Sequence, residues 1–487
     1  MNTVQRIAKN IAVLFTSQVA AFLLSLFYTV YLARYLSAEG FGIFSFALAF
    51  TGLFGTLSDI GFYQLTIREV ARDKSLASKY LANVSAMRLI LGIIVFGLIA
   101  LTINFLNKPE QTTKVVYLVA LGSLFGVFSH IFTSIFQAYE RMEYLFLGDL
   151  LSRVLSFCAV LVVIKCGFGV VGFAFFSLLI SVLASGFNYC LLSRTCLRPV
   201  SGWAPWKMEI DWNFWKLTIK EALPFGFAMI FMTIFYKIDS VMLSLMKGDA
   251  VVGWYNAAYK MVLALLFIPS SFIGAVYPVM SRYHQGPQES LTLSLEKSLK
   301  YLTLLGIPIG VGTTLLAKRF MLLMFGAEYT NSILPLQILV WSSVLIFMSQ
   351  PFGNLFNCLN RQSIVTRITG ICVVFNVVMN LILIPKYSLT GASIVTVLTE
   401  FASLTLCLFW AHRSGYSVLK KEFASVMLKV LMSSALMGIF IVRFRDLNLL
   451  ILVPSAALIY LVVLCMNRAI DEEDVSLVQS VFIKGTR

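Results

Sequence analysis

The chain is a succession of apolar runs, each long enough to cross a membrane. A bilayer core about 30 Å thick needs about 20 apolar residues in one helix. Backbone polar groups in lipid must be satisfied within the spanning segment. The sequence therefore predicts an all-α, polytopic membrane protein with about fourteen transmembrane helices. The runs cover residues 11–33, 40–62, 81–106, 115–137, 144–166, 170–192, 222–246, 251–277, 301–317, 333–356, 364–384, 389–411, 426–442 and 447–466.

Basic residues predict how these helices are oriented. The chain holds 38 Lys and Arg against 23 Asp and Glu, a net charge of +15. Sorted by the loops between predicted spans, 24 basic residues fall on the side of the N-terminus and 10 on the other. Lys and Arg collect in cytoplasmic loops. Both termini are therefore expected in the cytoplasm and the protein in the cytoplasmic membrane, and we expect no nucleic-acid partner.

Metal, cofactor and nucleotide motifs are not expected. The eight cysteines form no C-x-x-C pair, and no Cys or His lies at ligand spacing from any of the three histidines. The segment 167–172 satisfies G-x-G-x-x-G, but it joins two predicted membrane helices and lacks the βαβ context of a dinucleotide site. Without a P-loop, transport would draw on an ion gradient, a substrate gradient or a partner.

The two halves of the chain resemble each other. A shift of roughly 220 residues places FQAYER at 136–141 over FNCLNR at 356–361, and a slightly smaller shift places Gly42 over Gly253. Two six-helix repeats would be related by an axis along the membrane normal, with the substrate site between them near the midplane. The predicted parts are a first repeat at 1–192, a linker at 193–221, a second repeat at 222–413, two extra helices at 414–466 and a cytoplasmic tail at 467–487.

The predicted linker is rich in tryptophan and lysine. Such residues suit the headgroup region of a bilayer, so we expect this segment to lie on the cytoplasmic membrane surface. A role in gating substrate is the alternative. The residues are Trp203, Trp206, Trp212, Trp215, Lys207, Lys216 and Lys220.

Several ionisable residues lie inside the predicted spans. Such residues are costly in lipid and are functional candidates by default. At about 1.5 Å per residue, those of the second half lie near the midplane and those of the first half nearer the cytoplasm. The structural alternative is an internal ion pair or a side chain that snorkels near a helix end, and for His130 it is a core histidine with satisfied hydrogen bonds. They are Lys237, Asp239, Lys260 and Glu400 in the second half, and Asp59, Arg88, His130, Asp149 and Arg153 in the first.

The cations among them favour an anionic substrate. Lys and Arg bind phosphate or carboxylate, and several together can hold a diphosphate. Lys237 and Asp239 point about 200° apart on one helix. Asp239 could instead pair with Lys260 on the next helix, which would leave Lys237 for the substrate.

Two segments resemble a known family. One segment is DSVMLS at 239–244 together with VGWYNAAYK at 252–260, and the other is YLSAEGFG at 35–42. The similarity is to polysaccharide-type flippases of the multidrug/oligosaccharidyl-lipid/polysaccharide exporter superfamily, which include O-antigen flippases. The resemblance implies alternating access, and it implies movement of a polyprenyl-diphosphate-linked oligosaccharide or repeat unit from the inner to the outer leaflet. The first, second, seventh and eighth helices would line the chamber.

The resemblance and the depth of the charges together give a candidate site. Asp239 and Lys260 match charged positions of the family motif, and Arg34 lies beside the other motif. The expected substrate-binding residues are Lys237, Lys260, Arg88 and Arg34, and the expected charge partners or coupling residues are Asp239, Glu400 and Asp59. Lipid-linked oligosaccharide, membrane lipids and a polysaccharide polymerase or other export machinery are the expected partners.

Three other functions compete with this one. A cation-coupled multidrug exporter of the same superfamily would favour an acidic chamber. A polysaccharide polymerase or glycosyltransferase commonly needs a sizeable outer loop, whereas every predicted outer loop here has about fifteen residues or fewer. A scaffold in a cell-envelope assembly would make the buried charges dispensable. The sequence therefore favours a transporter over an enzyme.

Overall fold

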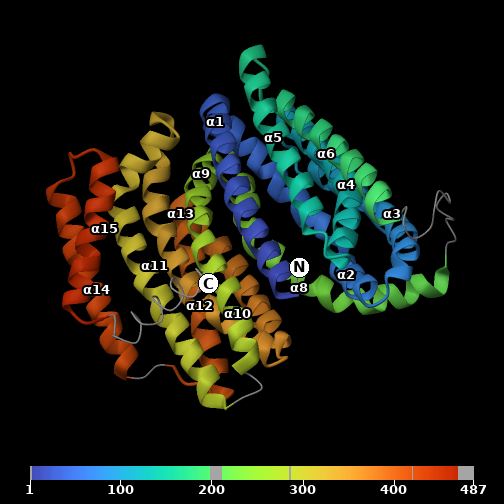
Figure 1. Cartoon of the computed structure of the whole chain (residues 1–487). Coiled ribbons are helices and arrows are strands. Elements are labelled where there is room, and N and C mark those ends of the chain that lie inside the picture. Colours follow the sequence, from blue (N-terminus) through green and yellow to red (C-terminus); the bar gives the residue numbers. More distant parts are fainter. Residues whose placement is uncertain (1–2, 198–210, 284–286, 419–420, 470–487) are drawn as a thin grey trace. The chain divides into compact units, whose positions relative to one another are not determined.

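A computed structural model describes residues 3–197, 211–283, 287–418 and 421–469, with side chains from residue 24 onward (Figure 1). Within these ranges every regular element is a helix, which confirms the predicted all-α class. The short helices are η1 (Lys74–Leu76), η2 (Ser193–Leu197) and η3 (Ala327–Ser332). The longer ones are α1 (Thr3–Asp59), α2 (Phe62–Arg72), α3 (Ala77–Phe105), α4 (Glu110–Ala138), α5 (Met142–Cys166), α6 (Val170–Leu192), α8 (Trp212–Lys247), α9 (Asp249–Leu265), α10 (Phe267–Tyr283), α11 (Gln288–Met324), α12 (Ile333–Cys358), α13 (Gln362–Arg413), α14 (Lys421–Arg443) and α15 (Leu449–Met466).

The described part of the chain holds twelve helical stretches long and apolar enough to span a membrane. Two of them, α1 and α13, each cover two predicted spans and are divided by a sharp kink. The kinks lie at Ser37 (φ 64°, ψ 175°) and Ser388 (φ 53°, ψ −133°). Dividing these two stretches at their kinks gives fourteen candidate membrane crossings, the number that the apolar runs predict. The chain is a multi-pass membrane protein.

One predicted span is broken in a way that the apolar pattern does not reveal. The run at 251–277 becomes two helices, α9 and α10, which are separated at Leu266. Pro269 has no backbone N–H, so it cannot donate to the carbonyl of Leu265 as a helix interior requires. The proline therefore accounts for the break.

The start of α8 falls inside the predicted linker and is attached to α3. The side chain of Asp211 accepts a hydrogen bond from the Phe214 amide, which caps the helix at its N-terminus. The indole N–H of Trp215 donates to Oδ1 of Asn83 at 2.8 Å. Of the other linker residues singled out above, Trp203, Trp206 and Lys207 lie outside the described ranges.

Contacts divide the chain into two compact units. Unit 1 comprises residues 1–260, 324–329 and 369–392, and unit 2 comprises residues 261–323, 330–368 and 393–487. Unit 1 therefore contains α1 to α6, α8, most of α9 and the middle of α13. Unit 2 contains α10, most of α11, α12, both ends of α13, α14 and α15.

Each unit has its own apolar core. In unit 1, α4 packs against α3 and α6, and α1 packs against α4, α5 and α8 (Figure 1). Phe46 and Phe50 of α1 lie in the main cluster with Phe173 of α6. In unit 2, α14 packs against α15, and the buried hydroxyl of Tyr460 donates to the carbonyl of Leu304 at 2.7 Å.

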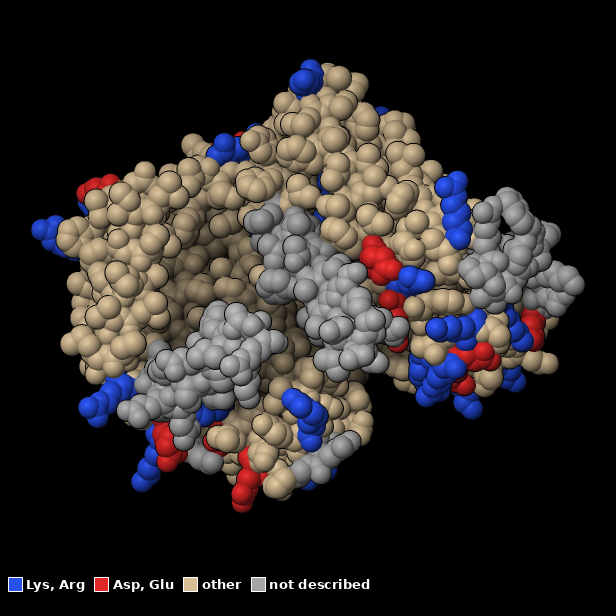
Figure 2. All heavy atoms as spheres, in the orientation of Figure 1, with Lys and Arg blue, Asp and Glu red and all other residues tan. Residues whose placement is uncertain are grey.

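The outer surface is apolar, as lipid contact requires. Phe105 is 86% exposed and Leu450 is 83% exposed. On the face shown in Figure 2, most of the surface is neither basic nor acidic, and charged residues gather mainly near its margins.

Candidate functional site

Unit 1 contains a partly open cavity of about 560 Å³. Side chains and backbone of α1, α3, α4, α6 and α8 line it. This volume lies within the range of about 300–1,000 Å³ that is typical of pockets for small ligands. A cavity of this size inside membrane-spanning helices is the candidate functional site.

One part of the cavity wall carries an incompletely compensated guanidinium. Arg88 of α3 is only 2% exposed, and its Nη2 lies 3.5 Å from Oδ1 of Asp59 at the end of α1. The same carboxylate oxygen accepts from the Tyr63 amide at 3.1 Å. Among the described residues, Nε and Nη1 of Arg88 have no hydrogen-bond partner. A buried positive charge with unused donors is stabilised by an anion placed beside it.

A second cation reaches the cavity from α8. Lys237 lines the cavity, and its ammonium donates to the carbonyl of Leu48 at 3.3 Å. A Cβ atom on Gly52 would lie 2.1 Å from this ammonium, so the ammonium occupies space that a side chain at position 52 would need. Lys260 of α9 is a further positive charge close enough to interact with that of Lys237. Arg88, Asp59 and Lys237 thus line one cavity, and Lys260 lies near Lys237 outside the lining.

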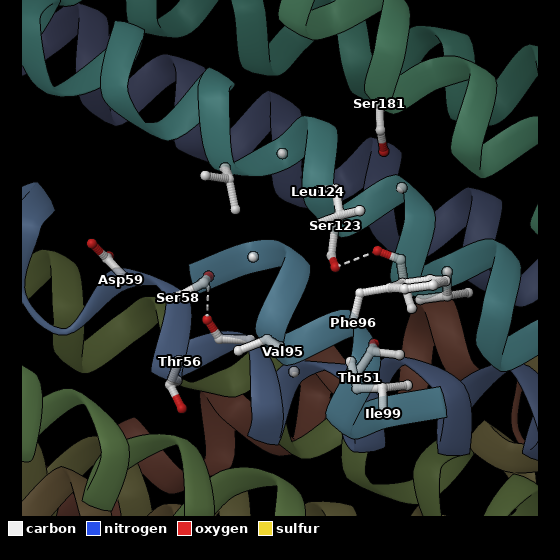
Figure 3. A pocket seen from close by; sticks show the side chains of 18 of the residues that line it. Thr51, Thr56, Ser58, Asp59, Val95, Phe96, Ile99, Ser123, Leu124 and Ser181 are labelled. Atoms are coloured by element: carbon white, nitrogen blue, oxygen red, sulfur yellow. Dashed lines mark hydrogen bonds between the residues drawn. The ribbon is translucent and has the colours of Figure 1, made fainter. Parts of the chain in front are cut away.

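Hydroxyl groups form another part of the wall. Each of the six donates to a carbonyl three or four residues earlier in its own helix, at 2.7–3.0 Å. Figure 3 shows the side chains of Ser123 and Ser181 among those that line the cavity, with Phe96 near Ser123 in this view. We call the set the hydroxyl wall; it consists of Thr51, Thr56 and Ser58 on α1, Ser123 on α4, and Ser177 and Ser181 on α6.

The hydroxyl wall was not predicted. Its only signal in the sequence is spacing, because Ser177 and Ser181 lie four residues apart and share one helix face. His130 also lines the cavity, on the same wall as Arg88 and Asp59.

Asp239 lies in unit 1 outside the cavity lining, in a buried polar network. Its carboxylate accepts from the hydroxyl of Tyr255 at 2.8 Å and from Nδ2 of Asn380 at 2.7 Å. Nδ2 of Asn380 also donates to Oδ1 of Asn376 at 2.9 Å. The sequence reasoning missed all three partners, although Asn376 and Asn380 stand four residues apart within one apolar run.

Arg34 and Glu400 are not among the residues that line this cavity. Nε of Arg34 donates to the carbonyl of Met324, the last residue of α11, at 2.7 Å. Glu400 belongs to α13 in unit 2, where it is 5% exposed. The depth of a residue along its helix therefore did not identify which cavity it reaches.

Metal-binding and disulfide chemistry have little basis in the described residues. They contain no group of three or more His, Cys, Asp or Glu side chains placed to hold a metal ion. All eight cysteines are free thiols.

Comparisons with known proteins agree with this architecture. A family model described as polysaccharide biosynthesis protein matches residues 7–284, and one described as MatE matches residues 224–382. The solved structure titled lipid II flippase MurJ, inward closed conformation, superposes with a TM-score of 0.73 at 16% identity and covers 93% of this chain and 98% of that one. That likeness confirms the fold.

Two curated relatives match at low identity. The probable low-salt glycan biosynthesis flippase of Haloferax volcanii is 25% identical over 194 residues, which is 39% of this chain and 41% of that protein. The match therefore spans less than half of that relative. The capsular polysaccharide biosynthesis protein CapF of Staphylococcus aureus is 22% identical over 408 residues, which is 81% of this chain and 97% of that protein.

Proposed function

The chain belongs to the polysaccharide biosynthesis protein family, and from that premise we propose that it is a flippase. Its cargo is a polyprenyl-diphosphate-linked oligosaccharide or polysaccharide repeat unit, which it carries across the membrane by alternating access. Similarity to relatives named for glycan flipping and capsule biosynthesis supports this cargo. The covalent structure of the cargo is left unchanged, so the protein is a transporter rather than a glycosyltransferase.

The cation-bearing cavity is the observation that carries the proposal. A diphosphate entering an apolar membrane loses its hydration, which is prohibitive unless opposite charge replaces the water. Arg88 and Lys237 line the cavity and Lys260 lies near Lys237. We assign the diphosphate to these three cations, with Asp59 as the resident counter-ion of Arg88. Lys260 also lies outside the cavity lining and belongs to the set because it interacts with Lys237. Arg34, which donates to the carbonyl at the end of α11, is left out.

The remaining sequence-based expectations belong to the same proposal. The protein lies in the cytoplasmic membrane with both termini in the cytoplasm, and it receives its cargo from the inner leaflet. A polysaccharide polymerase or other export machinery takes the cargo on the outer side. Asp239 and Glu400 are the candidates for coupling to an ion, and neither lies in the lining of the cavity.

A multidrug exporter of the same superfamily is the second candidate, because the MatE model matches residues 224–382. An exporter of cationic drugs needs unpaired acidic groups at its site. The acidic residue of this cavity is Asp59, which is already paired with Arg88. The charge of the cavity therefore favours the anionic cargo.

A glycine pair provides a matched test. A Cβ atom on either Gly126 or Gly97 would meet nothing within 4 Å, but only Gly126 lines the cavity. Gly126→Leu fills the cavity without an overlap at Cβ, and Gly97→Leu is the control. Full-length protein is reconstituted in liposomes with lipid-linked oligosaccharide, and the amount on each leaflet is measured.

The proposal predicts translocation by wild type and Gly97→Leu and a large loss for Gly126→Leu. Failure of wild type to move the lipid-linked oligosaccharide would refute the flippase function. Movement of a cationic dye in its place would identify the exporter, and lengthened oligosaccharide would identify a polymerase.

A further inference from the structure

We infer that the cavity is a glycosyl-diphosphate site, in which the cations take the diphosphate and the hydroxyl wall takes the sugar attached to it. The inference rests on the proposed function and deepens it. It assigns a sugar-binding role to Ser123, Ser177 and Ser181.

The hydroxyls of the wall differ from free hydroxyls in whether they still have a proton to donate to a ligand. A hydroxyl has one proton to donate and two lone pairs that accept. Each hydroxyl of the wall gives its proton to its own helix, so its oxygen can interact with a ligand only as an acceptor. The wall therefore complements a ligand that is rich in donors. A sugar, which carries several hydroxyl protons, is such a ligand.

The cationic part of the cavity has the opposite polarity. Arg88 and Lys237 bear only donors, and two nitrogens of Arg88 are unpartnered among the described residues. Phosphate oxygens only accept, so they complement these groups. One cavity thus offers donors at the cations and acceptors along the hydroxyl wall. A phosphate joined to a polyhydroxylated ring matches both at once.

The shape of the cavity also suits a ring. Phe96 lines it and can cover the apolar face of a sugar (Figure 3). Gly55 and Gly126 line it as well, and neither has any atom within 4 Å of its Cβ position. The two glycines therefore leave open space along the cavity lining.

The volume limits how much of the cargo can enter. A cavity of about 560 Å³ is of the size that encloses a drug-sized molecule. A diphosphate with one sugar is of that size, whereas an oligosaccharide with its polyprenyl chain is several times larger. We therefore assign recognition to the diphosphate and the first sugar, with the later sugars and the lipid tail outside the cavity.

Serine is common in membrane helices for reasons unrelated to ligands, since its hydroxyl can bond to the preceding turn. The chain supplies a control for this. Ser152 and Ser156 on α5 donate to carbonyls four residues earlier at 2.9 and 2.8 Å, and they do not line the cavity. Replacing them by alanine changes the same kind of bond in the same kind of helix.

The test separates the two subsites. Purified full-length protein in nanodiscs is titrated with inorganic pyrophosphate by calorimetry, and the concentration of lipid-linked oligosaccharide that gives half-maximal translocation is measured in liposomes. Variants are Ser123→Ala with Ser181→Ala, the control Ser152→Ala with Ser156→Ala, and Arg88→Gln. Thermal unfolding establishes that each variant is folded.

We expect the Ser123/Ser181 double variant to bind pyrophosphate like wild type but to need about tenfold more lipid-linked oligosaccharide, because two hydrogen bonds are lost. The Ser152/Ser156 control should match wild type in both measurements. Arg88→Gln should weaken pyrophosphate binding at least about tenfold. Polyprenyl diphosphate without sugar should inhibit translocation of lipid-linked oligosaccharide with the same inhibition constant in wild type and in the serine double variant.

Two results would overturn the inference. One is an unchanged half-maximal concentration in the Ser123/Ser181 variant, and the other is pyrophosphate binding that is absent in wild type or unaffected by Arg88→Gln. If wild type binds pyrophosphate with this dependence on Arg88 but does not translocate, the proposed function fails and the diphosphate part of the site stands. If wild type translocates lipid-linked oligosaccharide but the measurements do not depend on these residues, the proposed function stands and the inferred site fails.

Discussion

Gly42 and Gly253 meet in a reciprocal contact. A Cβ atom on Gly42 would lie 1.7 Å from the carbonyl oxygen of Asp249, and one on Gly253 would lie 1.9 Å from that of Ala38. Each glycine thus faces the carbonyl four residues before the other. The internal sequence match superimposes the same two glycines.

Gly253→Ala is predicted to destabilise the protein strongly, because the added methyl group would overlap backbone rather than a movable side chain. The free energy of unfolding should fall by about 1–3 kcal/mol or more. Gly274→Ala on α10 is the control, since a Cβ atom there meets nothing within 4 Å. Thermal unfolding in detergent checks the pair, and equal melting temperatures for the two variants would contradict the close approach.

Asn380→Ala is predicted to weaken the buried network around Asp239. It removes the donor that lies 2.7 Å from Oδ1 of Asp239. Hydrogen bonds to carboxylates contribute about 1.5–3 kcal/mol, against about 0.5–1.5 kcal/mol for neutral pairs. Asn256→Ala, whose partners are the Ser240 hydroxyl and the Val252 carbonyl, should therefore cost less. Denaturant unfolding measures the free energy of unfolding of both variants. A larger loss of stability for Asn256→Ala would reject the explanation.

The cap at the start of α8 is predicted to depend on pH. The hydrogen bond from the Lys79 ammonium, at 2.9 Å, and that from the Phe214 amide hold the pKa of Asp211 below its ordinary value of 3.8. Since the folded pKa is the lower one, the stabilisation is fully present above pH 3.8 and is lost as pH falls through the folded pKa.

Lys79→Met should move the pKa of Asp211 back toward 3.8, and the amide of Phe214 should then lose protection at a higher pH. Titration of carbon-13-labelled aspartate by NMR measures the pKa directly. An unchanged midpoint in Lys79→Met would show that the lysine is not the cause.

Ser37→Gly is predicted to stabilise the protein. Ser37 has φ 64° and ψ 175°, a backbone region that costs a residue with a side chain about 1–3 kcal/mol. Glycine relieves this strain, although its unfolded state has more entropy, so a net gain of about 1 kcal/mol is expected. Ser156→Gly, in a regular helix, should instead lose about 0.5–1 kcal/mol. Melting temperatures that move in the same direction for both variants would disprove the assignment of strain.

The membrane fold could be predicted because bilayer thickness fixes the length of an apolar helix. Even the kinks at Ser37 and Ser388 fall in the gaps between predicted spans. The early start of α8 could not be predicted, because its first turns mix tryptophan and lysine. It depends on contacts with Asn83 and Lys79, which are distant in the sequence.

The candidate site could be predicted only in part. A charge inside an apolar run is visible in the sequence, and Arg88, Lys237 and Asp59 were identified in this way. Which helix faces meet is a property of packing, so Arg34 and Glu400 could not be separated from the cavity residues in advance. The hydroxyls of α4 and α6 were missed because serine in a membrane helix carries no charge to mark it.

The bonds from the hydroxyl wall to its own helices have a consequence for the release of a ligand from the cavity. When a ligand leaves a buried pocket, donors that it had satisfied are normally orphaned, and the resulting penalty slows its departure. Here the six wall hydroxyls bond their protons to their own helices, and a ligand that uses their oxygens only as acceptors leaves those bonds in place. Emptying the cavity leaves no donor of the wall unsatisfied, so this surface can recognise a ligand without retaining it.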